Sequence, residues 1–221
     1  MKIIDISVAI NNETVVYPNN PSVSVEKITE IPEASSRLSK ISFGSHTATH
    51  IDAPSHTLIE GASIDSYSLE NFIGECRVFD FSYLEAGSLV KIADFEKAPS
   101  IENVNGIKDE VKAGDRILVK TSNSLRGYSE FYDDFVALDG DCADWLAEKN
   151  IALFGIDYLS IKQRGSNDNR AHNSLLSKNI PIIEGLNLKE VSAGIYELFC
   201  PPLKLTGTDG APARAVLIIK D

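Results

Sequence analysis

Residues 45–56 read SHTATHIDAPSH and hold three of the four histidines in this 221-residue chain. The ionisable residues of the stretch all fall at even positions: His46, His50, Asp52 and His56. On an extended chain these side chains would project from one face. A helix would stack His46 on His50 but turn Asp52 away, and the intervening β-branched residues disfavour a helix. The stretch is therefore predicted to be extended and to gather one polar site.

A straight strand could not bring the first two histidines to one metal ion. At about 3.3 Å per residue, His46 and His50 would lie about 13 Å apart at Cα. Each imidazole nitrogen must approach a zinc ion to about 2.0–2.1 Å. The chain is therefore predicted to bend near Ala48, as a curved strand end or a loop. Two imidazoles and a carboxylate are typical of a hydrolytic metal site, whereas hydrogen-bonded turns at a strand-to-loop junction are the alternative interpretation.

Composition indicates an ordinary globular chain and argues against two classes of partner. Hydrophobic residues make up 43% and charged residues 24% of the sequence, which is ordinary for a globular protein. The net charge is −11 and Lys and Arg form no run, so nucleic acid and anionic membrane surfaces are not expected as partners. The three cysteines, Cys76, Cys142 and Cys200, lie outside any CxxC spacing. Neither a disulfide framework nor a zinc knuckle is indicated.

The start, MKIIDISVAI, lacks the apolar core and cleavage site of a signal peptide. No apolar stretch approaches the length of about 20 residues that a membrane helix needs. We therefore expect a cytoplasmic protein.

Hydrophobic patterning predicts a strand-rich α/β fold in a single domain over residues 1–221. Strands are predicted at 2–6, 22–25, 38–43, 76–81, 116–120, 151–157, 180–184 and 215–219. Helices are predicted at 141–150, with an acidic first turn and a basic last turn, and at 169–178. No glycine-rich phosphate loop opens a helix, so nucleotide binding has little support.

The histidine-rich stretch resembles the HxGTHxDxPxH signature of the cyclase-like metal hydrolases, a family that includes bacterial kynurenine formamidase (arylformamidase) and isatin hydrolase. The opening Asp5-Ile6-Ser7 and Tyr17-Pro18 resemble the family's DIS and WPGD stretches, and residues 209–216, DGAPARAV, are similar to its DGSPxRAV run. The resemblance covers most of the chain. It implies the swivelling β/β/α-like fold of the family and a single metal-dependent hydrolase domain.

The resemblance also implies the second half of a metal site. In formamidases a helical histidine is followed twelve residues later by a glutamate after an apolar strand, and His172 and Glu184 have that spacing. Taken alone, His172 would be a helix-surface histidine and Glu184 a solvated strand end. The family pattern instead implies two ions held by the set His46, His50 and Asp52 and the set Asp52, His172 and Glu184. Asp52 would bridge them, since a carboxylate has two oxygens.

The remaining site residues take their roles from the same resemblance. His56 matches the general acid/base of the formamidases and is suited to proton exchange near neutral pH. Tyr17 matches an aromatic residue that contacts substrate there, although an aromatic beside a proline-rich turn is as often plain packing. Imidazole and carboxylate ligands suit zinc, and manganese or iron fit this set as well.

The implied activity is a metal-dependent amidohydrolase that cleaves a small non-peptide amide. The leading expectation is an aryl formamide such as N-formylkynurenine, in tryptophan catabolism. The alternatives are a ring-opening hydrolase of cyclic amides such as isatin, lactams or imides, and a non-catalytic metal-binding protein. Family members are usually homo-oligomers, so a dimer or tetramer is implied.

Several residues around the site depart from the family pattern and leave the substrate open. They are Ala48 for glycine, Tyr17 for tryptophan, Thr57 for an aromatic residue, residues 158–161 (YLSI) for PSVD, Asn173 for a second histidine and Gly185 for asparagine.

Overall fold

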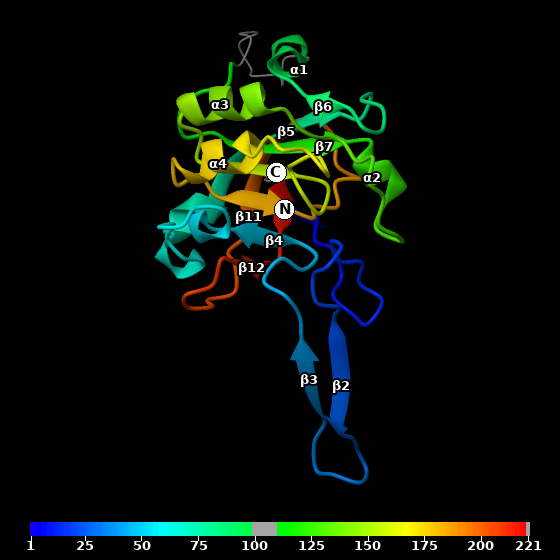
Figure 1. Cartoon of the computed structure of the whole chain (residues 1–221). Helices are drawn as coiled ribbons and strands as arrows, with labels where there is room; N and C mark the ends of the chain where they lie inside the picture. The colour runs from blue at the N-terminus through cyan, green and yellow to red at the C-terminus, as the bar shows by residue number, and fades with distance from the viewer. Residues whose placement is uncertain (99–109, 220–221) are drawn as a thin grey trace.

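A nine-stranded sheet forms the centre of the molecule in a computed structural model that describes residues 1–98 and 110–219 (Figure 1). Its strands are β1 (Lys2–Asp5), β4 (His50–Asp52), β5 (Ile73–Phe81), β7 (Arg116–Thr121), β9 (Leu153–Ile156), β10 (Ile182–Glu184), β11 (Gly194–Phe199), β12 (Gly210–Pro212) and β13 (Val216–Ile219). They run in the order β1-β13-β11-β5-β7-β9-β10-β4-β12. The four strands β5, β7, β9 and β10 are parallel, and antiparallel strands flank them on both sides.

Helices cover one face of the parallel strands (Figure 1). The helices that pack there are α1 (Ile92–Lys97), α3 (Gly140–Glu148) and α4 (Arg170–Leu176). The short helix α2 (Asn123–Arg126) follows β7 at the side of the molecule, and β6 (Leu89–Val90) and β8 (Ala137–Leu138) form a small parallel sheet of their own. Alternate strand residues point to opposite faces, so Ile117 and Val119 pack in the core under α3 and α4 while Leu118 packs in the core of the other face. A strand buried on both faces explains the continuous apolar runs of the sequence.

The sequence-based prediction of a strand-rich α/β fold is confirmed, and every predicted strand and helix has a counterpart. The predicted strand at 151–157, for example, is β9, and the predicted helix at 141–150 is α3. The sequence did not predict six of the strands and α-helices: β6, β8, β11, β12, α1 and α2. β12 has only three residues, and its Pro212 lacks a backbone N–H, which restricts it to a sheet edge.

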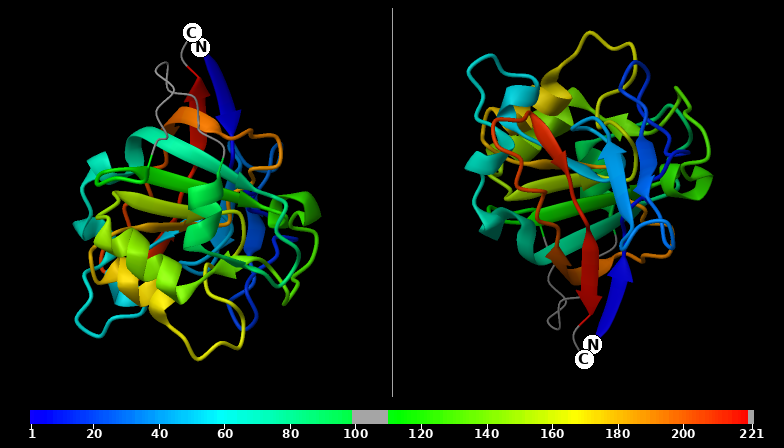
Figure 2. Two further views of the ribbon diagram at one scale, coloured as in Figure 1. Left: turned by 90° about the horizontal axis from the view of Figure 1, so that it is seen from above. Right: turned by 90° about the horizontal axis from the view of Figure 1, so that it is seen from below.

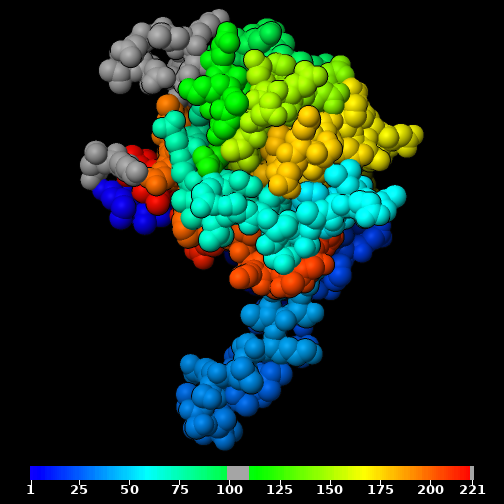
Figure 3. Space-filling model, turned by 90° about the vertical axis from the view of Figure 1, so that its left-hand side faces the viewer, coloured from blue at the N-terminus to red at the C-terminus, as the bar shows by residue number. Residues whose placement is uncertain are grey.

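The antiparallel pair of β2 (Ser24–Thr29) and β3 (Leu38–Ser42) forms a separate two-stranded sheet, an arm that projects from the body of the molecule (Figures 1 and 3). The arm comprises these two strands and the loop that joins them. Four large apolar side chains of the arm are each more than half exposed: Ile28, Ile31, Leu38 and Ile41. An isolated hairpin with exposed apolar residues offers surface to a partner.

The first strand lies beside the last at the edge of the sheet. β1 pairs antiparallel with β13, which brings the two ends of the described chain side by side (Figure 2). Among the described residues, no helix combines the length and the apolar character needed to cross a bilayer. Cys76, Cys142 and Cys200 are all buried and free.

Candidate metal centre

Strand β4 carries the centre of the histidine-rich site, and its neighbours supply the rest. β4 lies between β10 and β12, with His50 directly opposite Glu184 and Asp52 opposite Gly210. Cross-strand partners face the same side of a sheet. Helix α4 contributes His172, and a short 3₁₀ helix over Pro54–His56 ends in His56. The fold thus brings together residues that lie far apart in the sequence.

The chain bends at Ala48, where the distance argument requires it. Ala48 has a φ of 54°, in the left-handed region. The bend lets the His50 ring reach back, so that its Nδ1–H donates to the Ala48 carbonyl at 2.9 Å. Gly185, which also has a positive φ of 71°, lies against this bend: a Cβ there would be 2.1 Å from the Ala48 carbonyl oxygen. Close contact between two backbone segments therefore shapes the site.

The variant Gly185→Ala is expected to be much less stable than Gly165→Ala. Both glycines have a similar positive φ, 71° and 76°, but nothing lies within 4 Å of a Cβ at Gly165. Gly165→Ala should cost only the left-handed conformation, about 1–2 kcal/mol, whereas Gly185→Ala should cost about 1–3 kcal/mol more because backbone must move. Urea unfolding measures both. Equal losses would contradict the close packing at Ala48.

The inner part of the site consists of His46, His50 and Asp52. His46 Nδ1 lies 2.7 Å and His50 Nε2 3.4 Å from Asp52 Oδ1, and one ligand atom of each residue lies within 4.8 Å of the others. His50 Nε2 and Asp52 Oδ2 are buried and have no hydrogen-bond partner among the described residues. Buried polar atoms are normally satisfied. A Lewis acid would satisfy both, so these residues fit a divalent cation.

The outer part joins Asp52 to His172 and Glu184. His172 Nε2 lies 3.7 Å from Asp52 Oδ2 and 3.2 Å from Glu184 Oε1. Glu184 Oε2 is 3.4 Å from His50 Nε2, and the Ile161 N–H donates to Glu184 Oε1 at 2.7 Å. The two oxygens of Asp52 therefore face different histidines. This arrangement can serve two cation positions that share Asp52.

His56 lies at the open side of the cluster. Its side chain is 29% exposed, and its ring centroid is 4.0 Å from that of His46 and 5.4 Å from that of His172. One nitrogen of His56 also lies within 4.8 Å of ligand atoms of Asp52 and His172. A partly exposed imidazole beside the ligands can meet a bound substrate and exchange protons with it.

Tyr17 lies in an aromatic cluster beside the site rather than among the ligands. Its ring packs edge-to-face on Phe131 with centroids 5.3 Å apart, and the Arg164 guanidinium lies 5.8 Å from the ring centroid. Burial raises the pKa of the Tyr17 hydroxyl, the Arg164 charge lowers it, and the Glu184 carboxylate raises it again. The cluster meets the metal centre through Tyr158, whose carbonyl accepts from the Gly185 N–H at 2.7 Å, next to Glu184.

Asp209 belongs to the site although the sequence interpretation gave it no role. It lies in the loop before β12, with Oδ2 2.8 Å from His46 Nε2 and 3.8 Å from His56 Nδ1. The Ser45 hydroxyl donates to its other oxygen at 2.9 Å. The DGAP run that begins at Asp209 resembles the family's DGSP and was the one feature of the sequence that could have indicated it.

The charges of the site are arranged around buried carboxylates. Burial lowers the pKa of both inner imidazoles. Asp52 and Asp209 together outweigh this effect and raise the pKa of His46, and Asp52 with Glu184 raises the pKa of His50 to about 10. Burial raises the pKa of Asp52 and of Glu184, yet the imidazoles hold the pKa of each below its usual value. Protons on the imidazoles thus balance the carboxylates. A bound dication would neutralise the carboxylate charges instead and would displace the protons from the imidazoles.

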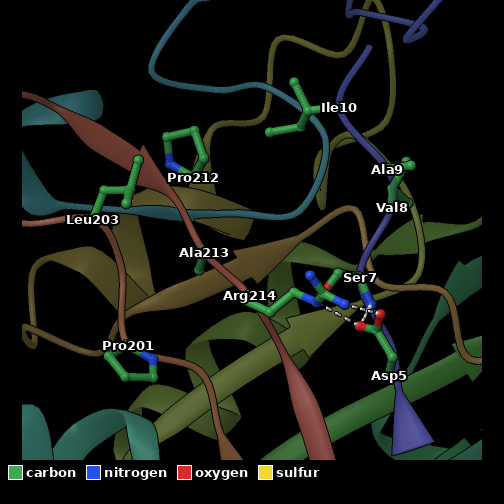
Figure 4. Close-up of a pocket in the computed structure, with 10 residues that line it drawn as sticks. All are labelled: Asp5, Ser7, Val8, Ala9, Ile10, Pro201, Leu203, Pro212, Ala213 and Arg214. Atoms are coloured by element: carbon green, nitrogen blue, oxygen red, sulfur yellow. Dashed lines mark hydrogen bonds and ion pairs between the residues drawn. The ribbon is translucent and has the colours of Figure 1, made fainter. Parts of the chain in front are cut away.

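A separate groove of about 460 Å³ lies between the segments 5–10, 201–203 and 212–214 (Figure 4). Val8, Ile10 and Leu203 give it an apolar lining, and the Asp5–Arg214 ion pair closes one end. None of the candidate metal ligands lines this groove. It is distinct from the metal centre.

The chain is similar to known hydrolases along its whole length. The family model described as "Putative cyclase" matches residues 4–163. The kynurenine formamidase of Salinibacter ruber (strain DSM 13855 / M31) is 34% identical over 220 residues, 98% of this chain and 97% of that protein. The kynurenine formamidase of Bacillus anthracis is 32% identical over 217 residues, 98% of this chain and 97% of that protein.

Solved structures share the fold. A protein described as a potential metal-dependent hydrolase with cyclase activity superposes with a TM-score of 0.82 at 34% identity, covering 100% of this chain and 98% of that one. Isatin hydrolase A from Ralstonia solanacearum superposes with a TM-score of 0.83, covering 99% of this chain and 92% of that one. At 21% identity this second likeness concerns the fold alone.

Proposed function

The chain belongs to the cyclase family, and we propose that it is a metal-dependent amidohydrolase that cleaves the C–N bond of an aryl formamide such as N-formylkynurenine. The observation that carries this proposal is the convergence of His46, His50, Asp52, His172 and Glu184. Two buried ligand atoms of this set, His50 Nε2 and Asp52 Oδ2, have no hydrogen-bond partner in the part of the chain that the structure describes. The formamidases that are about a third identical over nearly the full chain support the substrate class. We further propose that residues 1–221 act as one hydrolase domain.

The proposed ligands are His46, His50 and Asp52 for one cation and Asp52, His172 and Glu184 for a second. Zinc suits this set best, and manganese and iron are the other candidates. A cation bound there would lower the pKa of a water molecule and polarise the substrate carbonyl. The Ala48 carbonyl and the Ile161 N–H hold His50 and Glu184 in place for this task. Such outer contacts tune a metal site as much as its ligands do.

His56 is the proposed general acid/base. Burial holds the pKa of its imidazole below the usual value although the Asp52 charge raises it, so the ring is neutral near pH 7 and can accept a proton from the attacking water. It would then return that proton to the departing amine, because an unprotonated amine leaves poorly. Its partial exposure, in contrast to the buried His50, suits contact with a substrate.

The aromatic cluster beside the site supports an aryl group on the substrate. Tyr17 and Phe131 lie on the outside of a cluster built around the buried Tyr158. Aromatic rings prefer edge-to-face or offset contacts with other rings. We propose that Tyr17 contacts the ring of the substrate.

A substrate panel tests the proposed function. The purified protein, supplied with zinc or manganese, is assayed with N-formylkynurenine, isatin, a lactam and a cyclic imide, each with and without a chelator. Chelator-sensitive hydrolysis of the formamide, at a higher kcat/KM than any cyclic amide, is expected. Faster opening of isatin would favour the cyclic-amide activity instead. Metal binding without hydrolysis of any of the four would favour a non-catalytic protein.

We also propose that the protein is a cytoplasmic homo-oligomer, a dimer or a tetramer. The arm supports this because its apolar side chains, Ile28 and Ile41 among them, are exposed in a single chain. The buried free cysteines support a reducing compartment. Light scattering should give a multiple of 24.1 kDa, and Ile41→Glu should lower it. A wild-type mass of 24.1 kDa at micromolar concentration would contradict the oligomer.

A further inference from the structure

We propose that Asp209 is a positioning residue of the metal centre: its carboxylate holds His46 in the tautomer that presents Nδ1 to the cation. This inference rests on the proposed function, because it assumes that His46 binds a metal. It gives a role to Asp209, which contacts the proposed ligand His46 but is not itself a proposed ligand.

The two ring nitrogens of His46 contact two different carboxylates. Nδ1 lies 2.7 Å from Asp52 Oδ1, the same oxygen that His50 Nε2 approaches at 3.4 Å. Nε2 points the other way and lies 2.8 Å from Asp209 Oδ2. A cation shared by His46, His50 and Asp52 must therefore meet Nδ1. The proton of the neutral ring then belongs on Nε2, and this N–H donates a hydrogen bond to Asp209 Oδ2.

Asp209 is itself held in place. The Ser45 hydroxyl donates to its Oδ1 at 2.9 Å, and its backbone carbonyl accepts from the Ala53 N–H at 3.0 Å. The next residue, Gly210, leaves room for the imidazole, since a Cβ there would lie 2.9 Å from His46 Cε1. The loop before β12 thus fixes both the carboxylate and the ring that it contacts.

A hydrogen bond of the same kind fixes the tautomer of His50, the second inner histidine. His50 donates its Nδ1–H to the Ala48 carbonyl, which leaves Nε2 free to bind a cation. Metal-binding histidines generally donate the other ring N–H to a carbonyl or carboxylate, which fixes the tautomer and raises the basicity of the ligand. An ionised acceptor forms the stronger bond. Asp209 therefore fixes the tautomer of His46, as the Ala48 carbonyl fixes the tautomer of His50.

A direct ligand role for Asp209 fits the geometry less well. His46, His56 and Asp209 do have one ligand atom each within 4.8 Å of one another. In that trio, however, His46 would use Nε2, which faces away from the buried Asp52 oxygen that His50 shares. The Asp209 side chain is also 44% exposed, whereas Asp52 is fully buried.

Zinc titration of three variants tests this role, with affinity measured against a competing chelator. Asp209→Ala should bind zinc about 10–100-fold more weakly than wild type. Asp209→Asn should recover most of that loss, because its amide oxygen can still accept from His46 Nε2–H. Asp65→Asn is the matched control: Asp65 Oδ1 accepts from the Gly207 N–H and so holds the same loop from outside. This variant should bind zinc as wild type does.

Nitrogen NMR of the zinc-loaded protein gives a second readout that a structural role would not move. His46 should carry its proton on Nε2 in wild type and in Asp209→Asn, and this preference should be weakened in Asp209→Ala. Wild-type zinc affinity in Asp209→Ala would overturn the positioning role while leaving the proposed function intact. Asn and Ala variants that are equally weak, with the His46 tautomer unchanged, would also overturn it and make Asp209 a ligand. A wild-type protein that binds none of zinc, manganese and iron would overturn both proposals.

Discussion

Asp52→Asn protein is expected to purify with less than about a tenth of the wild-type metal and to hydrolyse no substrate above the buffer control. Asp52 is fully buried. Its Oδ1 faces His46 and His50, and its Oδ2 faces His172. Asparagine has the same shape but lacks the charge, and its NH₂ group offers no electron pair to a cation. Without the cation, the pKa of water keeps its ordinary high value, and neutral water is a poor nucleophile.

Asp157→Asn provides a matched control for this variant. Asp157 is as buried as Asp52, but its carboxylate accepts hydrogen bonds from Thr121 and Ser124. Its replacement should lower the free energy of unfolding by about 1–3 kcal/mol and leave the metal content per folded molecule unchanged. Elemental analysis and a hydrolysis assay compare the two variants. An Asp52→Asn protein with full metal content and activity would rule out the proposed ligand set.

His56→Gln is expected to retain its metal while kcat falls about 10²–10⁴-fold, the range that general acid/base catalysis contributes. Glutamine keeps the length and polarity of the side chain but cannot exchange a proton near pH 7. His172→Gln is the comparison, because His172 contacts both Asp52 and Glu184 and its loss should remove metal as well as activity. Metal analysis beside steady-state kinetics separates the two effects.

Loss of metal in His56→Gln would change the role assigned to His56. One of its nitrogens is near enough to Asp52 and His172 to share a cation with them. If His56→Gln lost as much metal as His172→Gln, His56 would be a ligand and the proton transfer would need another group. If kcat were unchanged with metal present, His56 would have no catalytic role.

Most strands of the central sheet, although not β11 and β12, could be predicted because local pattern determines them. The run at 153–156 is apolar throughout, and the structure buries it on both faces as β9. The bend at Ala48 followed from a distance argument, since a straight strand keeps His46 too far from His50. Ala48 adopts the positive φ that alanine seldom does.

Contacts between distant segments could not be predicted from local pattern. Glu184 alone resembles a solvated strand end, and only the β10–β4 register places it opposite His50. Asp209 contacts His46 across 163 positions of sequence, and its loop has no helix or strand period. Strand register and loop closure depend on tertiary packing, so the family resemblance rather than local pattern indicated His172 and Glu184.

Anomalous diffraction from zinc-loaded crystals tests the metal centre most directly. Data collected on both sides of the zinc absorption edge should show a peak about 2.0–2.2 Å from His46 Nδ1, His50 Nε2 and a carboxylate oxygen of Asp52. A second peak beside His172 and Glu184 would mark the second ion. Zinc bound away from these side chains, or no zinc peak in active protein, would contradict the assignment.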